Sequence, residues 1–260
     1  MHFEPIYIIS GLLVGFIVGL TGVGGGSLMT PILLHFGIAP SAAVGTDLLY
    51  AAVTKAGGVY VHNKKRNIDW RITGWLALGS LPASAVTLFV MHQIGFNSAG
   101  MNHFIKIMLG YALIFTSLAI IFKKKLLELS HRNDFWFTRM TSREQAIATW
   151  ITGIVLGAIV TITSIGAGAV GTVALFLLYP LLPTTKLVGT EIAHAVPLTL
   201  VAGLGHAGLG NLDLILLSNL LLGSLPGIYV GSHLASNVAE HYLRPALALM
   251  LVVVGSKLVL

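Results

Sequence analysis

Four ionisable residues stand in otherwise apolar stretches of the sequence: Asp47, Lys55, Glu191 and His194. Charged groups inside a membrane are costly and are by default candidates for a functional site. Asp47 and Lys55 lie about 12 Å apart along a helix, which favours Lys55 pairing with Glu191, although it can also neutralise Asp47 or balance a bound anion. His194 shares a helix face with Glu191 and can share a proton with it. All four are predicted to take part in ion coupling, with a structural ion pair or a helix-end carboxylate as the alternative.

A glycine-rich stretch, "GLTGVGGGSLMTP" from Gly19 to Pro31, interrupts an apolar segment. Three consecutive glycines spread around a helix and weaken it by about 1 kcal/mol each, so we expect a functional break there. Free N–H groups at the start of the second half-helix suit an anionic oxygen. The groups predicted to provide them belong to Gly24, Gly25, Gly26 and Ser27. Gly11, Gly15 and Gly19 have GxxxG spacing, which predicts close helix packing.

The amino-acid composition indicates a protein that lies within a lipid bilayer. Of the 260 residues, 55% are hydrophobic and 9% are charged, and the mean hydropathy is +0.88. One soluble core cannot bury so much apolar surface, and apolar runs of roughly 18 to 25 residues can cross a hydrocarbon core as helices. The absence of cysteine excludes disulfides and Cys-bearing metal sites. The chain is therefore predicted to be an integral membrane protein rather than an enzyme.

Basic residues are concentrated in two connections between the apolar segments. Of the fifteen lysines and arginines, four fall within 64–71 and six within 123–143. This is the positive-inside pattern, so both connections are assigned to the cytoplasm, and "HQIGFNSAGMNH", which has no lysine or arginine, to the outside. No nucleic-acid partner is expected, because one would need a basic groove interleaved with aromatic residues.

The apolar pattern predicts an all-α fold of about eight transmembrane helices. The expected segments are 6–37, 41–62, 72–91, 104–123, 145–181, 186–206, 213–233 and 243–260. The first and fifth are too long for one straight crossing and too rich in glycine to stay regular. Each is therefore predicted to be a pair of half-helices or a re-entrant hairpin.

The sequence also repeats itself at an offset of about 142 to 144 residues. "GLLVGFIVGLTGVGGG" aligns with "GIVLGAIVTITSIGAG", "VGTD" with "VGTE", and "LGSLP" with a second "LGSLP". We expect two four-element repeats, 1–123 and 145–260, joined by a basic cytoplasmic loop at 124–144. Paired halves with a break in corresponding places are typical of transporters whose site lies near the membrane midplane. Gly166, Ala167 and Gly168 would then form the partner of the first glycine break.

These motifs resemble the TauE/SafE sulfite exporter family, membrane permeases that move small organic and sulfur-containing anions. The resemblance covers nearly the whole chain and rests on "GLLVGFIVGLTGVGGGSLMTPILL", "PSAAVGTDLL", "SIGAGAVGTVAL" and "LVGTEIAHAVP" in this order. It implies a transporter in which the glycine breaks and the Gly-Thr motifs face the translocation path. The residues it implies for substrate binding are Gly24, Gly25, Gly26, Thr46, Ser164, Gly166, Gly168 and Thr190.

The chain departs from the family pattern once in each half. Where the family commonly reads Gly-Thr-Ser, the third residue is Asp47 in the first half and Glu191 in the second. Two negative charges beside an anion site oppose binding in a low-dielectric cavity, so at least one must be neutralised, most simply by a proton. The leading hypothesis is therefore proton-coupled secondary transport of sulfite, sulfonates or related oxyanions.

Two other functional classes follow from the same residues. A cation or metal-ion carrier would use Asp47, Glu191 and His194 as ligands, and a membrane-embedded enzyme would use the last two as acid and base. Neither a cofactor nor a resident metal is expected, and the partners are a small anion and the lipid of the cytoplasmic membrane, which the chain crosses repeatedly. The sequence leaves open the direction of transport, a homodimer or another oligomeric state, and a parallel or inverted repeat.

Overall fold

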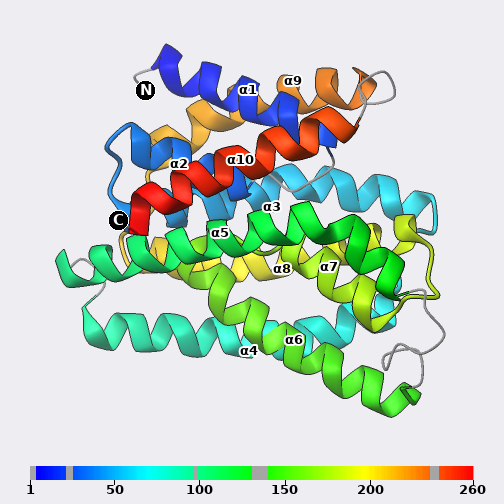
Figure 1. Cartoon of the computed structure of the whole chain (residues 1–260). Helices are drawn as coiled ribbons and strands as arrows, with labels where there is room; N and C mark the ends of the chain where they lie inside the picture. Colours follow the sequence, from blue (N-terminus) through cyan, green and yellow to red (C-terminus); the bar gives the residue numbers. More distant parts are fainter. Residues whose placement is uncertain (1–3, 22–25, 96–98, 131–139, 235–239, 260) are drawn as a thin grey trace.

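The computed structural model describes residues 4–21, 26–95, 99–130, 140–234 and 240–259. These residues form ten α-helices and no strand, which confirms the predicted all-helical class (Figure 1). The helices are α1 (Pro5–Thr21), α2 (Gly26–His35), α3 (Pro40–Lys64), α4 (Trp70–Ile94), α5 (Ala99–Ser130), α6 (Ser142–Thr163), α7 (Ala169–Leu178), α8 (Thr184–Gly208), α9 (Leu214–Leu234) and α10 (Glu240–Val259). Within the described residues, five helices are long and apolar enough to cross a membrane: α4, α5, α6, α8 and α9.

Two segments predicted to be interrupted each contain two helices. The first contains α1 and α2, and the residues between them, 22–25, lie outside the described part of the chain. The second contains α6 and α7, which are separated by residues 164–168. The connection expected at 124–144 differs at both ends, because α5 continues to Ser130 and α6 begins at Ser142.

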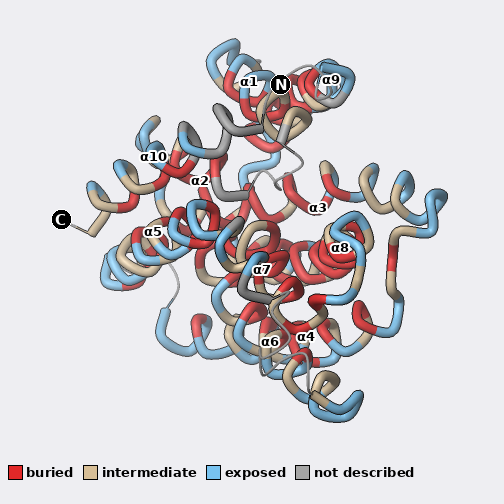
Figure 2. The backbone as a smooth tube through the Cα atoms, turned by 45° about the vertical axis from the view of Figure 1, so that its right-hand side comes forward, coloured by how far each residue is buried: buried red, intermediate tan, exposed pale blue. Residues whose placement is uncertain are grey.

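The helices associate in four pairs: α1 with α9, α4 with α6, α3 with α8, and α5 with α10. In Figure 1 the α1/α9 pair lies along the upper edge and the α4/α6 pair along the lower edge, with α3 and α8 between them. Buried residues are concentrated on the central helices, whereas the outward faces of the edge helices are exposed (Figure 2). Exposed leucine, valine and phenylalanine side chains on those faces are expected where lipid replaces water.

Glycine permits the two edge pairs to pack closely. A Cβ atom on Gly11 of α1 would lie 2.3 Å from the backbone oxygen of Leu220 in α9. A Cβ atom on Gly153 of α6 would lie 2.3 Å from the backbone oxygen of Leu76 in α4. No side chain fits at such distances, so the packing interpretation of the GxxxG spacing is confirmed at Gly11, and Gly15 makes a similar contact with α9.

The central helices α3 and α8 run antiparallel. The turn that follows each of them forms a hydrogen bond with a threonine near the start of the other. Asp69, in the turn after α3, donates its backbone N–H to Thr190 Oγ1 near the start of α8 at 2.9 Å. Asp213, in the turn after α8, donates its backbone N–H to Thr46 Oγ1 near the start of α3 at 3.3 Å. Both aspartates also cap the following helix through their carboxylates, which explains why α4 and α9 begin where they do.

Candidate functional site

The helix break between α6 and α7 lies in the buried interior. Its backbone has left-handed or otherwise positive φ angles at Ser164 (58°), Gly166 (115°) and Gly168 (153°). Glycine takes such angles at little cost, which explains two of the three residues found there. At the start of α7, the N–H of Gly171 donates to the backbone oxygen of Gly166 at 3.0 Å and that of Thr172 to the backbone oxygen of Gly168 at 3.0 Å. The N–H groups of Ala169 and Val170 remain without an intrahelical acceptor. They give this end of α7 a partial positive charge.

Lys55 extends from α3 into this break. Its ammonium donates a hydrogen bond to the backbone oxygen of Ala167, and only 7% of the residue is exposed. No described carboxylate oxygen lies within 4.0 Å of the ammonium nitrogen, so the ion pair with Glu191 suggested by the sequence is not formed directly. Glu191 nevertheless interacts with Lys55 more strongly than Asp47 does. The lysine therefore places a buried basic group at the break.

Asp47 has hydroxyl neighbours. It lies on α3 with no exposed surface, and the Thr30 hydroxyl of α2 donates a hydrogen bond to its Oδ2 atom. The hydroxyl of Ser164, in the break, lies beside the same carboxyl. Hydroxyl donors stabilise an ionised carboxylate. Asp47 thus joins α2, α3 and the break in one polar contact.

Glu191 occupies a different environment. It lies on α8, is 1% exposed, and its Oε1 atom has no hydrogen-bond partner among the described residues. Its carboxyl rests against the first turn of α7, because a Cβ atom on Gly171 would lie 3.0 Å from Oε1. A buried carboxylate without a donor is costly, whereas the protonated acid is much cheaper to bury. Oδ1 of Asp47 likewise has no partner among the described residues, so each acid has one unpaired buried oxygen.

His194 does not share a hydrogen bond with Glu191. Its Nε2 atom lies 2.8 Å from Ser80 Oγ of α4, and its Nδ1 atom has no partner among the described residues. The corresponding position of the first half holds Tyr50, whose hydroxyl faces Ser224 of α9. The two halves thus place a ring beside the serine of an "LGSLP" motif, but only the second half places an imidazole there.

The two threonines predicted to bind substrate, Thr46 and Thr190, instead form hydrogen bonds with turns of the opposite half. Thr46 accepts from the backbone N–H of Asp213, and Thr190 accepts from that of Asp69. Thr190 also donates its hydroxyl to the backbone oxygen of Lys186 at 2.7 Å. Both threonines are fully buried. These contacts give the Gly-Thr motifs a structural role in fixing α3 against α8.

The first glycine break is only partly visible. Gly24 and Gly25 lie outside the described residues, while Gly26 and Ser27 are the first two residues of α2. The start of α2 is followed by Thr30, whose hydroxyl contacts Asp47. The site described here therefore consists of the second break and the residues around it: Thr30, Asp47, Lys55, Ser164, Ala167, Gly171 and Glu191.

Several of these residues were not predicted from the sequence. Thr30 and Gly171 have no unusual chemistry in the sequence, and Ser80 is marked only by its duplicated motif. Ala167 was expected in the second break, but not as the acceptor of Lys55. His206 of α8, which was not selected from the sequence, is completely buried, with Nε2 2.9 Å from the backbone oxygen of Thr161.

The fold and the site define a class of protein. Several apolar helices, a buried helix break and ionisable side chains gathered around it are the construction of a multi-pass membrane transporter. The family model of the sulfite exporter TauE/SafE matches residues 7–258. The chain belongs to the TauE/SafE family.

Relatives cover nearly the whole chain. It is 38% identical over 252 residues to the probable membrane transporter protein YjnA of Bacillus subtilis, covering 97% of this chain and 98% of the relative. It is 27% identical over 248 residues to YdhB of the same organism, also named a probable membrane transporter protein, covering 94% and 95%. A probable membrane transporter protein of Methanocaldococcus jannaschii is 26% identical over 268 residues, covering 96% and 93%. No solved structure matches the chain.

Proposed function

We propose that this protein is a proton-coupled secondary transporter of small anions such as sulfite, sulfonates or related oxyanions, acting in the cytoplasmic membrane. The observation that carries the proposal is the buried ammonium of Lys55 at the break, beside the N-terminal turn of α7. Membership of the TauE/SafE family supports this substrate class.

The break provides two kinds of attraction for an anion. Lys55 supplies a positive charge when protonated, and the start of α7 supplies the N–H groups of Ala169 and Val170 and the positive end of a helix dipole. An oxyanion at the break can replace the carbonyl of Ala167 as the acceptor of Lys55. Because an ion is a better acceptor for an ammonium than a neutral carbonyl, binding gains a charge-assisted hydrogen bond.

Coupling to protons follows from the two carboxyls beside this cation. Both oppose an incoming anion, and in a low-dielectric interior that repulsion is worth several kcal/mol. The Thr30 hydroxyl donates to Asp47 Oδ2, which favours the ionised form of Asp47, while Asp47 Oδ1 and Glu191 Oε1 both lack a partner among the described residues. We therefore assign the coupled proton to Glu191, with Lys55 balancing the charge of Asp47. His194, one turn from Glu191, lies where it can serve the same proton pathway.

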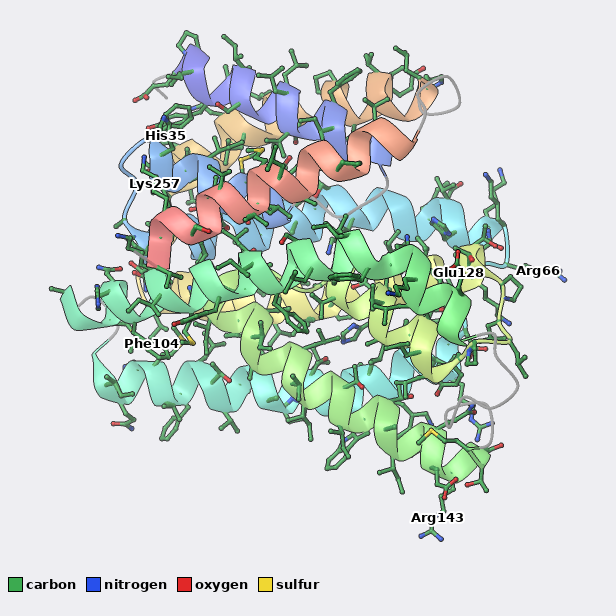
Figure 3. The ribbon with its side chains drawn as sticks, in the orientation of Figure 1. His35, Arg66, Phe104, Glu128, Arg143 and Lys257 are labelled. Carbon is green, nitrogen blue, oxygen red and sulfur yellow. The ribbon has the colours of Figure 1, made fainter. Side chains whose placement is uncertain are left out.

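We further propose that the two halves are inverted repeats. Two observations on helices support this: the corresponding helices α3 and α8 are antiparallel, and each of the four helix pairs joins one half to the other. Two observations on residues agree with it. Gly11 and Gly153 make matching contacts, and Arg66 and Gly210 take left-handed φ angles at matching turn positions. The basic end, where Figure 3 shows Arg66 and Arg143, would face the cytoplasm. The labelled residues His35 and Lys257 lie at the other end.

The cation-carrier alternative depends on Asp47, Glu191 and His194 meeting as ligands. The described residues, which include these three, contain no group of three histidine, aspartate, glutamate or cysteine side chains that could hold a metal ion. Lys55, which interacts electrostatically with both carboxyls, would also repel a cation when protonated. Anion transport is therefore the function that this arrangement supports better.

Reconstituted liposomes provide the test. Uptake of labelled sulfite or a small sulfonate should acidify the lumen and be driven by an inward proton gradient. Glu191→Gln should retain exchange of the anion across the membrane while losing its response to the gradient, and the exposed Glu128→Gln should behave like the unmodified protein. Transport of the anion without any dependence on a proton gradient would refute the coupling. Uptake of a divalent cation instead of the anion would refute the substrate class.

A further inference from the structure

A cavity lies at the basic end of the molecule and contains none of the residues of the helix break. Its volume is about 310 Å³, and its walls are the first turns of α4 and α6 and the segment that joins α7 to α8. Its lining includes Asp69, Arg71 and Trp75 at the start of α4, Gln145 at the start of α6, and Tyr179 and Leu181 in the segment between α7 and α8.

Most polar side chains of this cavity already have partners within the protein. Gln145 donates its Nε2–H to the backbone oxygen of Leu178 at 3.2 Å, and the Tyr179 hydroxyl is 2.7 Å from Thr149 Oγ1. Asp69 caps α4 and forms an ion pair with Lys186 at 3.5 Å. These contacts hold the walls in place and leave little unsatisfied polarity on them.

Arg71 is the exception. Its guanidinium forms no hydrogen bond or ion pair with any described residue, although it lines the cavity. The negative charge nearest in sequence, on Asp69, is already balanced by Lys186. The cavity therefore carries one uncompensated positive charge, with five N–H donors in a planar fork that suits two oxygens of a phosphate.

The other side of the cavity is apolar and reaches the protein surface. Trp75, one turn from Arg71, is 37% exposed, and Leu181 is 86% exposed. An exposed tryptophan next to a basic residue is the composition found where protein meets the headgroup layer of a membrane. A ligand that fits must combine an anionic head with an apolar body.

We propose that this cavity binds an anionic phospholipid at the basic end of the protein, with its phosphate on Arg71 and its upper acyl region against Trp75 and Leu181. Basic pockets between transmembrane helices on the cytoplasmic side bind anionic headgroups elsewhere for the same physical reason. The lipid would join the starts of α4 and α6 to the α7–α8 segment. The backbone N–H of Asp69 is bonded to Thr190 of α8, so the lipid would also brace the end of the central helix pair.

Native mass spectrometry of the purified full chain tests this directly. After equilibration with equal amounts of phosphatidylglycerol and phosphatidylcholine, the unmodified protein should retain phosphatidylglycerol preferentially. In a separate thermal-unfolding measurement, it should unfold at a higher temperature with phosphatidylglycerol than with phosphatidylcholine. Arg71→Gln should lower that retention about tenfold, because a bidentate charge-assisted contact is lost. Arg143→Gln, whose side chain points away from the helices at the same end (Figure 3), should change nothing.

Three results would overturn the proposal. Equal retention of both lipids by the unmodified protein would show that no headgroup is selected. An equal loss in the Arg143 and Arg71 variants would show that only the overall positive charge of this end matters. Stabilisation by inorganic phosphate or glycerol phosphate to the same extent as by the lipid would identify a site for a free anion instead.

Discussion

Lys55→Met removes the buried cation of the helix break while keeping a side chain of similar length. Lys55 is 7% exposed and donates to the carbonyl of Ala167, so the substitution deletes a hydrogen bond from a charged donor. It also leaves the charges of Asp47 and Glu191 without their nearest balancing group. We expect the protein to insert but to be less stable.

The size of the loss follows from these contacts. A hydrogen bond to a charged group contributes about 1.5–3 kcal/mol, and removing one partner from a buried set of charges costs about 3–5 kcal/mol in total. The loss is limited, because an orphaned carboxylate can take up a proton at about 1.4 kcal/mol per pH unit. It should therefore be largest above neutral pH and shrink as the pH falls and the acids become neutral.

Reversible unfolding in mixed detergent micelles, followed by circular dichroism, measures this loss. Glu191→Gln in the Lys55→Met background should recover about 1–3 kcal/mol, since removing both charges leaves no orphan. The exposed Lys125→Met should change stability by less than about 0.5 kcal/mol. A Lys55→Met protein with unchanged stability but weaker anion binding would assign Lys55 to the substrate alone. Unchanged stability and unchanged transport together would refute any role for it.

Three further predictions concern glycines. Gly166 has a φ of 115°, so Gly166→Leu should strain the break by about 1–3 kcal/mol and abolish uptake while the protein still inserts. Normal uptake by this variant would place the translocation path elsewhere. Gly57→Leu, at an exposed glycine with open space around it, is the control. Gly171→Ala places a methyl group 3.0 Å from the Glu191 carboxyl and should shift the pH dependence of uptake, whereas Gly74→Ala, with open space around it, should not. Gly208→Cys, also in open space, should react with a membrane-impermeant thiol reagent from outside the cell, and Asn63→Cys only from inside. Labelling of both from the same side would refute the inverted arrangement.

The helical framework was accessible from the sequence because it depends on local properties. Apolar runs of membrane-crossing length predicted the helices, and glycine clusters predicted two interruptions, of which the one at 164–168 lies within the described residues. The GxxxG spacing at Gly11 predicted close packing but did not say against which helix. Its partner, Leu220 of α9, is far away in the chain, and only the assembled bundle identifies it.

The candidate site was accessible in part. Buried charges stand out in an apolar sequence, so Asp47, Lys55, Glu191 and His194 could be named from residue type alone. Their partners could not, because the contacts join residues such as Lys55 and Ala167 that are 112 positions apart. The carbonyl that accepts from Lys55 is backbone, and no residue type marks it.

The sequence by itself determined the solvent, the helices, the breaks and the identity of the buried charges, since each depends on composition or on neighbours within a few turns. The tertiary structure alone decided that the Thr30 hydroxyl donates to Asp47 and that Oε1 of Glu191 lies against Gly171 without a described partner. Two carboxyls at matching positions of a duplicated motif thus have different neighbours. Those neighbours set the free energy of each buried charge, and helices distant in the chain supply them.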